Sequence, residues 1–159
     1  MYLGLYKRND DIYIEWGTYH TLPQCDDPNA LFVEVSSWDP QLNEKGEPVP
    51  QVFSADHELV KAAHRATCER LLHAHIYAHY PIPTQNSIQS ISMLAVLNDW
   101  QDILQETQRI WDWIVQCIAV YRQHASDPAM GLPDFAALVP YDATLKRLSD
   151  LEAMVAAKQ

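Results

Sequence analysis

Histidine is the residue type in this sequence whose spacing most suggests chemistry. His57, His64, His75 and His79 lie together with Cys68 in a segment that has a helical pattern. At about 100° per residue, these positions fall within about 60° of one another on one side of a helix. His64 with Cys68 and His75 with His79 are spaced four apart, so each pair could bind one metal ion from adjacent turns. These four residues are the metal-ligand candidates of the sequence.

Several features argue against a metal centre. The two pairs are roughly 16 Å apart along a helix axis, so one chain cannot combine them in a single four-ligand site. The Glu-x-x-His spacing of di-iron bundles is absent, because Glu69 precedes His73 by four positions and His75 by six. The histidines also border a charged helix face, where half-packed imidazoles are common. We therefore expect no bound metal ion and no cofactor.

Other catalytic motifs are absent from the sequence. It has no G-x-S-x-G motif, no phosphate-binding glycine loop and no dinucleotide fingerprint, and only 4 glycines from which to build such loops. Asp10-Asp11 and Asp26-Asp27 are acidic pairs, but the glycine and distal glutamate of an EF-hand are missing. We expect a protein that is not an enzyme and has no catalytic residues.

The charge balance limits the class of partner. The chain has a net charge of -10, and its first 56 residues hold 10 acids against Lys7, Arg8 and Lys45. Binding to nucleic acid or an anionic membrane requires clustered Lys and Arg, which this sequence lacks. A basic protein partner remains compatible with the charge.

Cysteine usage and the N-terminus both indicate a cytoplasmic site of synthesis. Cys25, Cys68 and Cys117 are widely spaced and odd in number, which favours reduced thiols over a disulfide framework. The first residues lack the pattern of a signal peptide, and no stretch approaches 18 uninterrupted apolar residues.

The first third of the sequence predicts β-structure. Residues 2–6 and 12–19 are rich in aromatic and β-branched types around a polar turn, which predicts a hairpin, and 31–35 could add a third strand. The segment 40–50 is predicted to be a loop. We therefore expect residues 1–53 to form a β-rich docking part with a proline-rich loop.

Residues 54–159 are predicted to be helical, within one cooperative unit of α+β class. The first helix is expected over 54–79, with Ser54 as N-cap and Pro81 and Pro83 after its end. A very long helix is expected over 87–124, which contains no Pro or Gly, and a short closing helix over 142–157. The helices would form a hairpin or bundle.

The predicted long helix has apolar residues at alternating spacings of three and four, a heptad-like seam typical of bundles and coiled coils. A second apolar stripe lies beside it, so this helix needs cover from several directions. With few other helices available, we expect a homo-oligomer or a place in a larger assembly. The predicted interface residues are Leu97, Trp100, Leu104, Trp111, Trp113, Ile114, Ile118 and Tyr121.

The N-terminal segment MYLGLYKRNDDIYIEWGTY, a proline-spaced linker and the helical segment SISMLAVLNDWQDILQETQRIWDWIVQCIAVY together resemble small virion-associated proteins of tailed bacteriophages, such as tail, baseplate or fibre-attachment proteins. In that class a β-element docks onto one partner while helices assemble with a neighbour. The resemblance concerns architecture over most of the chain, and it implies a structural viral protein and a possible virion location.

Three function classes remain open at the level of the sequence. The leading expectation is a non-enzymatic structural protein that self-associates or docks into a larger complex, with protein partners rather than nucleic acid or membrane. An acidic, monomeric binding protein of the immunity or antitoxin kind is the alternative, with a basic protein as its partner. A metal-dependent helical enzyme is the weakest of the three.

Overall fold

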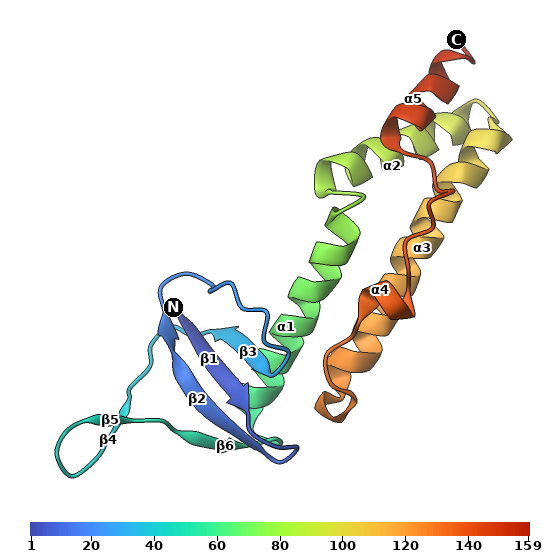
Figure 1. Cartoon of the computed structure of the whole chain (residues 1–159). Helices are drawn as coiled ribbons and strands as arrows, with labels where there is room; N and C mark the ends of the chain where they lie inside the picture. The colour runs from blue at the N-terminus through green and yellow to red at the C-terminus, as the bar shows by residue number, and fades with distance from the viewer. The chain divides into compact units, whose positions relative to one another are not determined.

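The computed structural model describes residues 1–159 and has the predicted α+β class, an N-terminal antiparallel sheet followed by helices (Figure 1). The strands are β1 (Tyr2–Lys7), β2 (Ile12–Tyr19), β3 (Ala30–Glu34), β4 (Gln41–Leu42), β5 (Pro48–Val49) and β6 (Val52–Ser54). The helices are α1 (Glu58–Tyr77), α2 (Ile82–Leu97), α3 (Gln101–Ser126), the short 3-10 helix η1 (Pro128–Met130), α4 (Phe135–Leu138) and α5 (Leu148–Ala156).

The residues group into two compact units. The sheet unit comprises Met1–Arg70 and Arg122–Pro133, and the helical unit comprises Leu71–Tyr121 and Asp134–Gln159. Helices α1 and α3 contribute residues to both units. The division into 1–53 and 54–159 that the sequence suggests stays a prediction.

The sheet unit is built on four antiparallel strands in the order β3-β1-β2-β6. The pairing of β1 with β2 confirms the predicted hairpin, and β3 confirms the third strand. Alternation along the strands turns Leu3, Leu5 and Leu31 to one face, where they form a buried cluster with Val60 and Ala63 of α1. The N-terminal half of α1 therefore covers this inner face of the sheet.

The outer edge of the sheet at β3 is closed by side chains of α1. The Phe32 backbone N–H donates to Thr67 Oγ1 at 3.4 Å, and the Phe32 carbonyl accepts from Arg70 Nη2 at 2.9 Å. Arg70 also donates to Thr67 Oγ1 at 2.8 Å. Because Phe32 already has partners for both of its outward backbone groups, a further strand cannot pair with it there.

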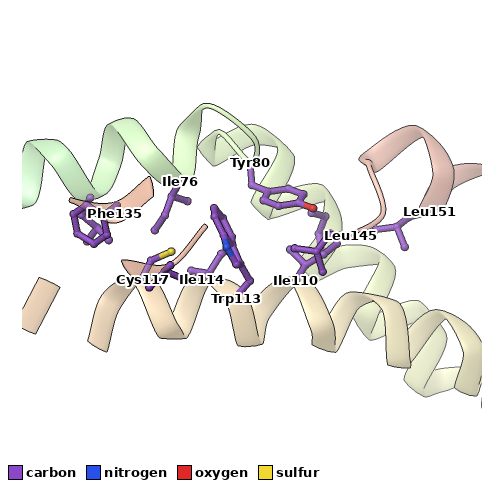
Figure 2. Packing of buried hydrophobic residues seen from close by; sticks show 12 residues of the cluster. Ile76, Tyr80, Ile110, Trp113, Ile114, Cys117, Phe135, Leu145 and Leu151 are labelled. Atoms are coloured by element: carbon purple, nitrogen blue, oxygen red, sulfur yellow. The ribbon is translucent and has the colours of Figure 1, made fainter. Parts of the chain in front are cut away.

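The helical unit has its own core between α3, α2, α5 and the end of α1. Figure 2 shows Ile110, Trp113 and Ile114 of α3 directed toward Ile76 and Tyr80, all of them buried. The Trp113 indole N–H donates to the Pro140 carbonyl at 3.1 Å. The 135–145 segment and α5 close this core with Phe135, Val139, Leu145 and Leu151.

The single helix predicted over 87–124 is wrong in one respect, because the chain turns between Leu97 and Gln101. The long helix that remains is α3, with 26 residues. Asp99 adopts a left-handed conformation with φ of 56°. The Trp100 N–H then bonds to the Ala95 carbonyl at 2.9 Å and the Asp99 N–H to the Val96 carbonyl at 3.4 Å. This is the Schellman pattern, which ends a helix by satisfying its last carbonyls.

Three predicted helix starts are also corrected. Ser54 belongs to β6, and α1 begins at Glu58 instead. The preceding His57 caps its first turn, because the His57 Nδ1 accepts from the Leu59 N–H at 3.1 Å. Helix α2 starts at Ile82 rather than at 87, since proline fits the first turn, where its missing N–H has no helical partner. The closing helix starts at Leu148 rather than at 142.

The predicted loop 40–50 contains a small hairpin, in which β4 pairs with β5. Its turn is fixed by Asn43, whose side chain accepts from the backbone N–H of Lys45 and of Glu47, each at 2.9 Å.

Across the whole chain, none of the helices combines the length and the apolar character that crossing a bilayer requires.

Candidate functional site

Helix α2 is unusual in this acidic chain because its 16 residues, IPTQNSIQSISMLAVL, include no charged side chain and no histidine. Ile88 and Ala95 of α2 are buried in the helical unit, with Ile91 partly buried beside them. Met93, Val96 and Leu97 are spaced as neighbours on the opposite side of the helix. The helix is therefore apolar on two sides, and only one side is covered by the chain itself.

The uncovered side of α2 is strongly exposed. The exposed fractions of Met93, Val96 and Leu97 are 62%, 65% and 80%. Isolated exposed apolar residues are normal, but three neighbours on one helix turn form a patch of the kind that marks interaction sites.

A groove of about 660 Å³ lies next to this patch, between α2 and α3. Val96 belongs to both the patch and the groove, so the two are continuous. The groove is lined by Ser92, Val96, Gln101, Leu104, Gln105, Thr107, Gln108 and Trp111. We refer to Met93, Val96, Leu97, Leu104 and Trp111 as the α2–α3 surface.

The groove has no charged residue among those that line it. The charges of α3 near its start are neutralised within the helical unit instead. Asp102 forms an ion pair with Lys158 at 3.0 Å, and the hydrogen bond from Lys158 lowers the pKa of Asp102. Arg109 pairs with Glu106 at 3.1 Å. The residues that line the groove are thus uncharged, and at its border two of the glutamines donate to carboxylates, Gln101 to Asp99 and Gln108 to Asp112.

The predicted interface residues fall into three groups in the structure. Trp113 and Ile114 are buried in the core of the helical unit, and Trp111, Ile118 and Tyr121 are half-buried against it. Leu104 and Trp100 are half-buried, whereas Leu97 is almost fully exposed. Among the predicted set, the structure brings Leu97, Leu104 and Trp111 to one surface.

The pair of His64 and Cys68 lies inside the sheet unit. His64 is only 2% exposed, and its Nε2 lies 2.9 Å from the His124 carbonyl and 3.5 Å from Cys68 Sγ. Burial lowers the pKa of His64 and raises the pKa of the Cys68 thiol to about 11, so both groups are held neutral near pH 7. No third ligand joins them.

The second pair lies among aromatic rings of the helical unit. His75 Nε2 is 2.8 Å from the Val139 carbonyl, and its ring is 5.6 Å from that of Phe135 in a stacked arrangement. His79 stacks on Tyr141 with ring centroids 3.6 Å apart. These imidazoles act as packing groups, and the structure has no cluster of three or more His, Cys, Asp or Glu side chains that could hold a metal ion.

Comparison with known proteins adds no relative. No family model, no curated protein and no solved structure matches this chain.

The sequence reasoning missed Met93 and Val96 as surface residues and the aromatic side chains Tyr6 and Trp16, which are 40% and 47% exposed. A signal for the first two was present, because the charge-free run from Ile82 to Asn98 stands out in a chain of net charge -10. For Tyr6, the signal was its place directly after Leu5, where an antiparallel strand with one buried face normally alternates, whereas Trp16 lies between Glu15 and Gly17 and has no such signal.

Proposed function

We propose that this protein is a non-enzymatic assembly protein that self-associates through the α2–α3 surface. The observation that supports this most is the fully uncharged helix α2, which exposes Met93, Val96 and Leu97 beside a groove lined without charge. Removing such a surface from water would stabilise an interface by roughly 25 cal/mol per Å² of apolar area.

A second copy of the chain is the occupant that the charge distribution favours. Two copies with a net charge of -10 repel each other wherever their acidic surfaces meet. The α2–α3 surface is a place where two copies can meet without bringing like charges together. A basic partner would find carboxylates only at the border of this surface, at Asp99 and Asp112, and none among the residues that line the groove.

The test is the molar mass of the untagged full chain, measured by native mass spectrometry and light scattering over a range of micromolar concentrations. We expect a metal-free oligomer for the unchanged protein. Leu97→Glu would place a carboxylate in the interface and is expected to shift the population to monomer. Because Leu97 is 80% exposed, this change should leave the folded chain intact.

Val115→Glu is the matched control, since Val115 is 60% exposed on α3 and does not line the groove. It introduces the same charge at a similarly exposed helical position and should leave the oligomer unchanged. A monomer at all concentrations for the unchanged protein, or equal effects of the two variants, would overturn the proposal. The acidic binder of a basic partner would then become the better hypothesis.

Membership of a larger assembly, such as the tail of a bacteriophage virion, is a compatible extension of this proposal. It is supported by the architecture described from the sequence, in which a β-part and a helical part could each contact a different neighbour.

A further inference from the structure

The outer face of the sheet, opposite α1, is the second uncovered apolar region of the chain. In an antiparallel sheet with one face on the core, the other face is normally polar. Here β1 directs Tyr6 outward, and Trp16 of β2 and Phe32 of β3 lie beside it. The Tyr6 and Trp16 rings are 6.5 Å apart in an edge-to-face arrangement, and the Trp16 and Phe32 rings are 6.0 Å apart.

Tyr19 belongs to the same group of rings, and two paired glycines leave the sheet beside it without side chains. Gly4 and Gly17 pair across β1 and β2. A Cβ at Gly4 would lie 3.0 Å from the Phe32 ring and 3.2 Å from the Tyr19 ring, and a Cβ at Gly17 would lie 3.5 Å from the Tyr19 hydroxyl. The two glycines therefore let the rings of Tyr19 and Phe32 lie close to the sheet. We refer to Tyr6, Trp16, Tyr19 and Phe32 as the aromatic face. Its exposed rings are Tyr6 and Trp16, Tyr19 is half-buried, and Phe32, only 5% exposed, packs against Trp16 and Tyr19.

The polar groups of these rings are free. The indole N–H groups of Trp38 and Trp113 donate to Glu15 and to the Pro140 carbonyl. By contrast, Trp16 Nε1 and the hydroxyls of Tyr6 and Tyr19 have no intramolecular hydrogen bond. A purely apolar partner would bury these groups without satisfying them, which is unfavourable.

We infer that the aromatic face binds a neutral carbohydrate. A pyranose ring offers an apolar C–H face to stack on Trp or Tyr and hydroxyls that pair with free N–H and O–H groups. The exposed carboxylate of Glu34, which the register places on the same side of the sheet as Phe32, is a further acceptor for hydroxyls. The net charge of -10 disfavours an anionic ligand. This inference does not depend on self-association.

A peptide that adds a strand to the sheet fits less well. At β3 the Phe32 backbone groups are already bonded to Thr67 and Arg70, and the opposite edge strand, β6, has only three residues. An oligoproline segment could still lie on the aromatic rings, and it is the competitor that the test must separate.

The test is a titration of the ¹⁵N-labelled full chain, followed through its indole N–H signals. The chain has 5 tryptophans, and loss of one signal in Trp16→Phe assigns that of Trp16. The probes are maltohexaose, cellohexaose, chitohexaose and an oligoproline peptide. We expect at least one saccharide to shift the Trp16 signal saturably, in the millimolar range or tighter.

Two substitutions of Tyr6 test whether the rings of the aromatic face contact the saccharide. Tyr6→Ala should weaken it about tenfold, whereas Tyr6→Phe, which keeps the ring, should weaken it less. Tyr77→Ala is the control, because Tyr77 is a similarly exposed tyrosine of the helical unit. The inference is overturned if no saccharide shifts the Trp16 signal, if only oligoproline does, or if Tyr6→Ala binds as the unchanged protein.

Discussion

His64 is the one histidine of the chain that is almost fully buried, and its neighbours explain why it stays neutral. Burial lowers its pKa most, and the hydrogen bond to the His124 carbonyl acts in the opposite direction. The charged or titratable groups around it are Cys68, His124, Asp127 and Lys7. Protonation would place a cation in the core of the sheet unit.

Because the folded state depresses the pKa of His64, the unfolded chain takes up the proton first as pH falls. The free energy of unfolding should therefore be highest above about pH 6.5, the unfolded pKa, and fall as pH decreases below it. His64→Gln, which keeps an N–H donor, should reduce this fall. The measurement is urea unfolding at about pH 7.5 and about pH 5.5.

His20→Gln is the control for that comparison, since His20 is exposed in the same unit. Its profile should run parallel to that of the unchanged protein. A parallel profile for His64→Gln as well would show that His64 does not contribute to the acid sensitivity.

Gly4 is the second residue whose effect can be measured directly. Gly4→Ala should lower the free energy of unfolding by about 1–3 kcal/mol, because the added methyl would press on the Phe32 and Tyr19 rings. Phe32→Leu removes the closest of these contacts. In a double-mutant cycle by chemical denaturation, the cost of Gly4→Ala should therefore be smaller in the Phe32→Leu background, and equal costs would contradict the packing argument.

At the scale of the elements, the turn between α2 and α3 depends on one left-handed residue. Asp99→Gly should raise the free energy of unfolding by about 0.5–1 kcal/mol, because glycine adopts this conformation without a Cβ clash. Asp112, which is exposed within α3, is the matched control. Asp112→Gly should change stability in the opposite direction by a similar amount, measured by thermal and urea unfolding.

The same turn shows why the helix pattern was only partly predictable. Apolar residues continue at spacings of three and four from Met93 through Trp100 to Leu104, so periodicity alone does not reveal the break. A left-handed Asp is a weak signal, since glycine is the usual residue at that position. The strands β1, β2 and β3 were predictable because strand patterns and turn residues agreed there.

The candidate site was less predictable than the fold. Spacing places Leu97 and Ile114 on one seam, yet the structure exposes the first and buries the second. The difference arises from α5 and the 135–145 segment, which cover part of α3 and have little periodicity of their own. Likewise, the histidine spacing suited metal binding, but backbone carbonyls and aromatic rings occupy those side chains.

At the scale of the whole molecule, net charge and the uncharged surface would make opposite contributions to the proposed self-association. Long-range repulsion between copies that each have a charge of -10 weakens association, whereas the contact itself involves no charge.

Added salt should therefore strengthen self-association. Sedimentation or light scattering at low and then at high sodium chloride should show a larger oligomer fraction in high salt, because screening removes the repulsion. Binding to a basic partner would weaken under the same change. An oligomer that dissociates as salt is added would contradict the uncharged interface.

The bonded groups at Phe32 on the β3 edge affect the tendency of the protein to aggregate in concentrated solution. When chains are held together by one interface, their other surfaces are at a high local concentration. An open strand edge would then template pairing from chain to chain, with no geometric limit on growth. Thr67 and Arg70 remove that opportunity at Phe32, so the proposed assembly through α2 would not be extended by strand pairing at that point of β3.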